Sequence, residues 1–310
     1  MQNKISILSS KKYNYIKKEI IKNNENFINI EIEAKKFPDG ENFWRFNNAA
    51  DIKNKPAVLI CGTIDNDAIF ELYNLASSLV RENCSALHIV IPYFGYSTME
   101  HALKPGDVVT TKNISHLISS IPQAPFGNFV YLVNLHSVDT QYYFENNTHT
   151  IHINTENILD EIISRIKTKE KNVVLASADM GRAKWIERTS SRLNMPSAYI
   201  MKKRISGEKT SIEGINADVK NKTVVICDDM IRSGGSILDA VQAYKSMGAK
   251  KIYIICIHGV FTKGSIEKLE NSKIIEKIYC TNTHSKTQTI KSSLIEIVDI
   301  TKTIKNNLQI

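Results

Sequence analysis

The sequence Val224-Val225-Ile226-Cys227-Asp228-Asp229-Met230-Ile231-Arg232-Ser233-Gly234-Gly235-Ser236 places an apolar run, two adjacent carboxylates and a glycine pair in one order. An apolar run of this kind is typical of a strand that is covered on both faces. Gly234 and Gly235 let backbone N–H groups approach an anion without interference from a Cβ atom. A helix expected from residue 235 onward adds the positive end of its dipole, which favours a phosphate there. The stretch therefore predicts a buried strand that leads into a phosphate site.

The same alternation of apolar runs and amphipathic segments extends along the chain. Strands are expected at 57–61, 87–91, 129–134, 173–176, 197–201, 224–227, 252–257 and 278–281. Helices are expected between them, at 67–82, 110–120, 155–166, 182–193, 235–247 and 263–270. Strand–helix–strand repetition predicts an α/β fold with mostly parallel sheets flanked by helices. In such sheets, ligands bind at the loops that leave the carboxyl ends of strands.

Two domains are expected, because a chain of 310 residues exceeds the usual size of one. The boundary is expected near 148–155, which gives domains 1–150 and 151–310. Residues 294–310 carry one more strand and a helix, and this tail could return to pack on the first domain.

Composition narrows the class of partner. The net charge is +8, but the basic residues are spread along the chain and no basic stripe interleaved with aromatics suggests a nucleic-acid groove. The longest apolar runs are too short to span a bilayer, and residues 1–10 lack the apolar stretch of a signal peptide. Five cysteines without a C-x-x-C pair indicate buried thiols in a reducing compartment. A cytoplasmic protein with neither nucleic-acid nor membrane partners is expected.

The paired acids need a reason of their own, because carboxylates beside a phosphate site would repel the phosphate. Asp228 and Asp229 make sense as partners of ribose hydroxyls, or of a Mg²⁺ ion that bridges to the substrate. A plain turn followed by a helix N-cap is the alternative, but it does not explain the whole ordered run behind an apolar strand. The run therefore predicts a site for a phosphorylated sugar, made by Asp228, Asp229, Arg232, Ser233, Gly234, Gly235 and Ser236.

This run resembles the phosphoribosyl-binding signature shared by type I phosphoribosyltransferases and phosphoribosyl pyrophosphate synthetases (ribose-phosphate pyrophosphokinases). The resemblance implies two phosphoribosyltransferase-like (type I) domains. Four further segments are similar to the synthetases, and with the signature they extend the likeness from about residue 37 to residue 283: Phe37-Pro38-Asp39-Gly40-Glu41, Pro92-Tyr93-Phe94-Gly95-Tyr96 with its continuation to Lys112, Val133-Asn134-Leu135-His136-Ser137, and Ala176-Ser177-Ala178-Asp179-Met180-Gly181-Arg182-Ala183-Lys184. A simple transferase is usually shorter and lacks the nucleotide half.

The resemblance also implies site roles. Phe37, Asp39 and Glu41 match a loop that contacts the adenine of ATP bound by a neighbouring subunit. His136 matches a residue that contacts the metal–ATP complex, so His136 and Asp179 are the expected Mg²⁺ contacts. Lys202 and Arg204 match the catalytic pair at the base of a mobile loop. The family forms dimers and hexamers, so a homo-oligomer is expected.

One stretch departs from the family. After Gly-Tyr the synthetases carry Ala-Arg-Gln-Asp-Arg-Lys, whereas this chain has Ser97-Thr98-Met99-Glu100-His101-Ala102. Thr cannot replace an Arg fork on a phosphate, so no ATP role passes to Thr98 or Met99. Lys104, His101 and Arg182 are the candidates for holding the polyphosphate.

The expected activity is transfer of the diphosphoryl group of Mg-ATP to the C1 hydroxyl of ribose 5-phosphate, which supplies phosphoribosyl pyrophosphate for nucleotide biosynthesis and releases AMP. Two alternatives stay open. A type I phosphoribosyltransferase would consume the activated sugar with a nucleobase and ignore ATP. A non-catalytic regulatory homologue would bind phosphosugar or nucleotide and turn over neither, and another nucleotide preference is also compatible with the departure at 97–102.

Overall fold

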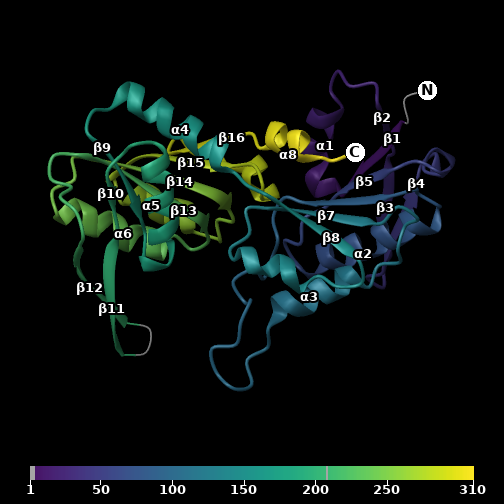
Figure 1. Ribbon diagram of the computed structural model, residues 1–310, viewed down its shortest axis with the longest axis horizontal. Coiled ribbons are helices and arrows are strands. Elements are labelled where there is room, and N and C mark those ends of the chain that lie inside the picture. Colours follow the sequence, from purple (N-terminus) through teal and green to yellow (C-terminus); the bar gives the residue numbers. More distant parts are fainter. Residues whose placement is uncertain (1–3, 207–208) are drawn as a thin grey trace. The chain divides into compact units, whose positions relative to one another are not determined.

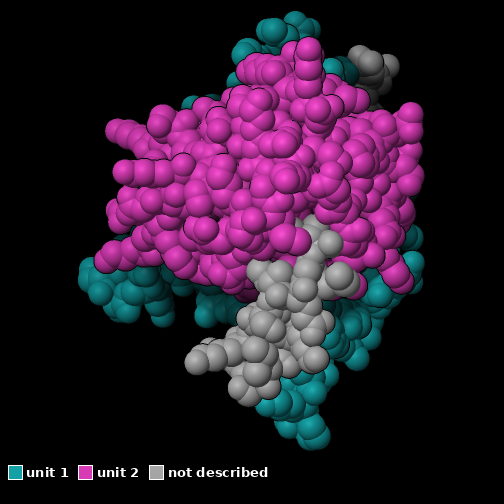
Figure 2. All heavy atoms as spheres, turned by 90° about the vertical axis from the view of Figure 1, so that its left-hand side faces the viewer, with its two compact units in different colours: residues 1–154, 301–310 teal, residues 155–300 magenta. Residues whose placement is uncertain are grey.

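The structure is a computed structural model that describes residues 4–206 and 209–310, and for residues 201–215 its account is confined to the backbone. The chain divides into two compact units, which Figure 2 distinguishes by colour. Unit 1 comprises Met1–Asn154 and Thr301–Ile310, and unit 2 comprises Thr155–Ile300. Each unit contains one six-stranded sheet with helices packed on it, so the predicted α/β fold class is confirmed.

The sheet of unit 1 has the order β2-β1-β5-β6-β7-β8, and all of its strand pairs are parallel (Figure 1). Its core joins the strands to α2 (Asn66–Arg81) and α3 (Thr110–Ser119). An antiparallel hairpin of β3 (Ile32–Lys36) and β4 (Asn42–Phe46) is separate from the sheet. The sheet strands are β1 (Ile5–Ser9), β2 (Phe27–Asn29), β5 (Ala57–Ile60), β6 (Leu87–Ile91), β7 (Asn128–Val133) and β8 (Thr148–Ile153).

The sheet of unit 2 has the order β10-β9-β13-β14-β15-β16 and is also parallel. The antiparallel hairpin of β11 (Ile200–Ser206) and β12 (Lys209–Ile215) extends away from this sheet in Figure 1. The sheet strands are β9 (Val173–Ser177), β10 (Ser197–Ala198), β13 (Thr223–Ile231), β14 (Lys251–Gly259), β15 (Ile275–Thr281) and β16 (Ile295–Val298). The helices are α4 (Glu156–Lys169), α5 (Ala183–Arg192), α6 (Gly235–Ser246) and α7 (Ser265–Asn271).

The C-terminal helix α8 (Thr301–Asn307) belongs to unit 1, where it packs against α1 (Asn14–Ile21). Beyond it, the N–H of Gln309 donates a hydrogen bond to the buried hydroxyl of Tyr131 on β7, with a length of 3.2 Å. The chain therefore finishes in the unit in which it began.

Both sheets reverse their winding at one position. In unit 1 the chain passes from β1 to β2 on one side and from β5 to β6 on the other. In unit 2 it passes from β9 to β10 on one side and from β13 to β14 on the other. Ligands of open parallel sheets bind in the crevice at such a reversal, beyond the carboxyl ends of the strands. The crevice between β9 and β13 is therefore the expected site of unit 2.

The described parts of the chain, 4–206 and 209–310, contain no helix with both the length and the apolar character needed to cross a membrane. All five cysteines are free thiols and all are buried, as their apolar surroundings in the sequence predict.

The segment that contains Gly95 is held by close backbone contact. The Gly95 N–H donates a 2.7 Å hydrogen bond to the Thr63 hydroxyl, and a Cβ atom at position 95 would overlap the Thr63 carbonyl oxygen. Since that neighbour is backbone, it cannot yield by changing a rotamer. The glycine is required for packing between the connections that follow β5 and β6.

We expect Gly95→Ala to lower the free energy of unfolding by about 2 kcal/mol, because the added methyl forces a backbone shift in a packed region. Urea unfolding followed by circular dichroism measures the change. Gly235→Ala is the matched control, since its nearest neighbour beyond the adjoining residues is the Ser233 hydroxyl at 3.7 Å, an ordinary contact. Equal stabilities of the two variants would contradict the packing argument.

Candidate functional site

Strand β13 continues past the end of its neighbour β9. Its pairing with β9 stops at Cys227, opposite Ser177, whereas its pairing with β14 continues to Ile231, opposite Gly259. The sequence predicts that the strand stops at 227, and the structure shows four more strand residues. Asp228 and Asp229 thus lie inside a strand, in the part that faces the crevice at the sheet reversal.

The two carboxylates have different surroundings. Asp229 is 5% exposed, and its Oδ2 lies 2.6 Å from a guanidinium nitrogen of Arg182. Asp228 is only partly buried, and its Oδ1 accepts a 2.9 Å hydrogen bond from the Asp229 N–H. Asp229 is therefore a paired, interior carboxylate, whereas Asp228 still has access to the crevice.

Crowded negative charge alters the ionisation of Asp228. Burial, together with the charges of Asp229 and Asp179, raises the pKa of the Asp228 carboxyl from an ordinary 3.8 to about 8. At neutral pH this group is therefore mostly protonated in the protein alone. A cation or a hydroxyl donor that approached it would favour the ionised form.

The connection from β13 to α6 forms an open anion cradle. Gly234 caps the helix with a φ of 75°, in the left-handed region that glycine adopts without strain. Thr262 anchors the loop through its N–H, which donates a 3.0 Å hydrogen bond to the Arg232 carbonyl. Within the described residues, no hydrogen bond is donated by the cradle N–H groups of Ser233, Gly234, Gly235 and Ser236. These donors, at the positive end of α6, are arranged to receive an anion.

The connection from β9 to α5 supplies the other wall of the crevice. It contains Asp179, which is partly buried, and Arg182. The Ser177 hydroxyl donates a 2.7 Å hydrogen bond to the Asp179 carbonyl, and the Tyr244 hydroxyl donates one of 3.0 Å to the Ser177 carbonyl. Tyr244 and Thr262 therefore support the site, although neither belongs to a motif that would identify it from the sequence.

The remaining predicted residues are divided between unit 1 and the hairpin of unit 2. Phe37, Asp39 and Glu41 form the exposed tip of the β3–β4 hairpin, which is closed by a 2.8 Å hydrogen bond from the Phe37 N–H to the Glu41 carbonyl. His136 follows β7 and is partly buried. The side chains of Lys202 and Arg204, predicted to be catalytic, lie outside the described residues.

The divergent stretch lies in the long connection between β6 and α3 of unit 1, which extends from the rest of that unit in Figure 1. The Tyr143 hydroxyl donates a 2.6 Å hydrogen bond to the Glu100 carbonyl, and the His101 ring lies 3.3 Å from the Glu100 carboxylate. His101 and Lys104 are exposed, whereas Arg182 is committed to Asp229. The three candidates for a polyphosphate contact thus have unlike environments.

The carboxylate oxygens of this crevice suit Mg²⁺, but they do not form a complete set of ligands for it. In the described part of the chain, no three His, Cys, Asp or Glu side chains are grouped to hold a metal. Asp179 and Asp228 offer hard oxygen ligands, and Mg²⁺ usually keeps waters and substrate phosphates as its other ligands. The site suits a metal that arrives with a phosphorylated substrate.

Two protein-family models match the chain. One is the N-terminal domain of ribose phosphate pyrophosphokinase, over residues 5–121, and the other is the phosphoribosyl synthetase-associated domain, over residues 162–309. Ribose-phosphate pyrophosphokinase of Pyrococcus abyssi is 28% identical over 282 residues, which cover 90% of this chain and 92% of that protein. The enzyme of the same name from Clostridium perfringens is 31% identical over 219 residues, or 70% and 66% of the two chains.

A solved structure extends the likeness to three dimensions. The crystal structure of phosphoribosylpyrophosphate synthetase from Mycobacterium smegmatis matches with a TM-score of 0.86 at 20% sequence identity. The match covers 98% of this chain and 97% of that one. At this level of identity it shows a shared fold.

We expect Asp228→Asn to make the protein more stable at alkaline pH. Asp228 has a pKa near 8 in the folded chain, against about 3.9 in an unfolded one. The folded state therefore binds the extra proton between these values, and wild-type stability falls as pH rises through this window. The amide keeps the hydrogen-bond acceptor without the charge. Thermal melts at pH 5 and pH 9 should show a larger stability advantage of the variant at pH 9.

Asp239→Asn is the control for this experiment, because Asp239 is exposed on α6. Its melting temperature should follow the wild-type pH profile. A pH-independent difference between Asp228→Asn and wild type would show that Asp228 ionises normally.

Proposed function

Because the chain belongs to the ribose-phosphate pyrophosphokinase family, we propose that it transfers the diphosphoryl group of Mg-ATP to the C1 hydroxyl of ribose 5-phosphate, giving phosphoribosyl pyrophosphate and AMP. The observation that carries this proposal is the anion cradle at the start of α6, which lies directly after the acids of β13. An anion site beside hydroxyl-binding carboxylates suits a sugar that carries a phosphate.

In this proposal, the cradle binds the 5-phosphate. The N–H groups of residues 233–236 and the hydroxyls of Ser233 and Ser236 donate to its oxygens, and Arg232 adds positive charge. Asp228, the more accessible of the two acids, accepts hydrogen bonds from the ribose hydroxyls. The side chain of Asp229 is fixed by its ion pair with Arg182.

The reaction needs positioning and charge neutralisation more than covalent help. The C1 hydroxyl gives up its proton to water as its oxygen forms a bond to the β-phosphorus, and the bond from that phosphorus to the oxygen of the α-phosphate breaks, which releases AMP. Lys202 and Arg204 would stabilise the charge that develops on the phosphoryl oxygens. Bound Mg²⁺ would neutralise phosphate charge. Asp179 is the candidate metal contact of unit 2, and His136 is the candidate contact of unit 1.

The nucleotide end of the site is proposed from the hairpin tip of unit 1. Phe37 is 47% exposed and Asp39 and Glu41 are also exposed, so the tip can reach a nucleotide held by another copy of the chain. A purine could stack on the Phe37 ring and donate a hydrogen bond from its amino group to a carboxylate oxygen. The proposal therefore includes a homo-oligomer, dimer or hexamer, with ATP shared between neighbours.

Of the alternatives, the one that the substitutions at 97–102 support is a homologue that binds ATP or ribose 5-phosphate but converts neither of them. The arginine side chain that contacts ATP in the family is replaced by Thr98 in this segment of the chain. Production of AMP separates the synthetase from this alternative, and consumption of phosphoribosyl pyrophosphate without ATP would identify a transferase.

Incubation with Mg-ATP and ribose 5-phosphate should produce AMP, and omission of the sugar phosphate should abolish it. Quantification of AMP by chromatography checks this. A regulatory homologue would give no AMP, and a transferase would instead consume phosphoribosyl pyrophosphate with a nucleobase in the absence of ATP.

Lys202→Ala should lower the turnover number by about 10² or more, the typical loss for a donor that acts on the transition state. Lys220→Ala is a suitable control, because Lys220 is an exposed lysine outside the site. Circular dichroism verifies that both variants fold. Wild-type turnover in Lys202→Ala would remove this residue from the mechanism.

A further inference from the structure

Arg182 brings a permanent positive charge into the acidic crevice. Its guanidinium lies 2.6 Å from the Asp229 carboxylate, and the two side chains are only 20% and 6% exposed. A guanidinium stays charged at any pH that a protein tolerates, and its planar fork matches a carboxylate. The pair is therefore an ionic contact largely withdrawn from water, where screening by salt is weak.

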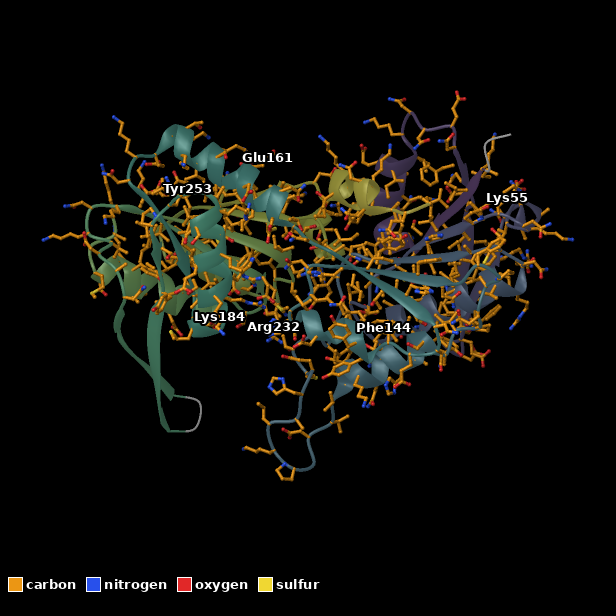
Figure 3. The ribbon with its side chains drawn as sticks, viewed as in Figure 1. Lys55, Phe144, Glu161, Lys184, Arg232 and Tyr253 are labelled. Carbon is orange, nitrogen blue, oxygen red and sulfur yellow. The ribbon has the colours of Figure 1, made fainter. Side chains whose placement is uncertain are left out.

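The acids around Arg182 outnumber it. Asp179 follows β9, and Asp228 and Asp229 lie on β13, so three carboxylates approach one crevice from neighbouring strands. The mutual effect of their charges is visible in the raised pKa of Asp228. Arg232 and Lys184 are labelled in Figure 3: Arg232 lies in the connection after β13 and Lys184 in the first turn of α5, and both are exposed. Arg182 makes a direct ionic contact with one of these acids, Asp229.

We propose that Arg182 is a built-in cation of this site, which occupies Asp229 and so keeps a divalent metal ion from binding to the paired acids before the sugar phosphate arrives. This inference rests on the proposed function, because it concerns the metal that the diphosphoryl transfer uses. Arg182 is a positioning residue in this account, since it acts through Asp229.

The consequence is a division of roles between the acids. A divalent ion bound by adjacent carboxylates would draw both toward itself and away from ribose hydroxyls. With Asp229 already neutralised, Asp228 is left as the acid that the sugar can reach. The metal is then held mainly by substrate phosphates, in agreement with the absence of a three-ligand group among the described residues.

Mn²⁺ binding to the free protein, measured by electron paramagnetic resonance, tests this inference. Wild type should bind Mn²⁺ weakly in the absence of substrates. Arg182→Gln should bind it tighter by about tenfold or more, because a partly buried cation in direct contact with Asp229 is removed. Arg182→Lys, which keeps the charge, should resemble wild type, and a role in packing alone does not predict this rescue.

Two controls locate the effect. Arg188→Gln removes one positive charge from an exposed position on α5, the helix that follows Arg182, and should leave Mn²⁺ affinity at the wild-type value. The double variant Arg182→Gln/Asp229→Asn should lose the gain, which places the new metal site at Asp229. Because both partners are removed together, this variant also avoids an unpaired buried carboxylate and should fold.

Unchanged Mn²⁺ affinity in folded Arg182→Gln overturns the proposal. If Arg182→Gln does not fold, wild type and Asp228→Asn decide the question. Tight Mn²⁺ binding by wild type that is lost in Asp228→Asn would show that Arg182 does not keep the metal from the acids. Weak Mn²⁺ binding by wild type that is unchanged in Asp228→Asn supports the exclusion of the metal. Since no ATP or sugar is present, these titrations can fail or succeed whether or not the chain produces AMP.

Discussion

Strand β13 carries two adjacent carboxylates past the end of β9, and the electrostatic cost of placing them there constrains the rest of the site. Two acids on neighbouring positions of a buried strand cannot both remain charged without a counter-charge. Arg182 supplies it for Asp229, and a raised pKa reduces the charge of Asp228. The crevice thereby keeps one reactive carboxyl in contact with solvent while the other is fixed beneath it.

The two sheets share one winding pattern, but the described residues at the two reversals differ in the helix cap that an anion would meet. In unit 1, the helix after β5 is capped by Asp65, whose carboxylate accepts a 2.8 Å hydrogen bond from the Ala68 N–H and pairs with Lys12 at 2.6 Å. In unit 2, the corresponding helix α6 is capped by Gly234, which has no side chain. A phosphate would meet an existing negative charge at α2 and unoccupied donors at α6. The difference between the units is thus a matter of one cap residue and its charge.

Much of this arrangement could be predicted from the sequence, because apolar runs such as 224–227 are what a strand covered on both faces requires. The end of β13 was not predictable in the same way. Asp228 and Asp229 have low strand propensity and read as a turn, but β14 continues to pair beside them up to Ile231. The ion pair between Arg182 and Asp229 joins segments that are distant in the chain, so no local pattern indicates it. Likewise, the sequence offers Arg182 as one candidate among three for holding ATP, whereas the structure places it against an acid.

A crystal structure of the protein grown with ribose 5-phosphate would show where the sugar phosphate binds. We expect the 5-phosphate on the backbone N–H groups at the start of α6, with the ribose hydroxyls against Asp228 and the Arg182–Asp229 pair intact. A sugar phosphate bound elsewhere, with the cradle at 233–236 empty at saturating ligand, would contradict this expectation.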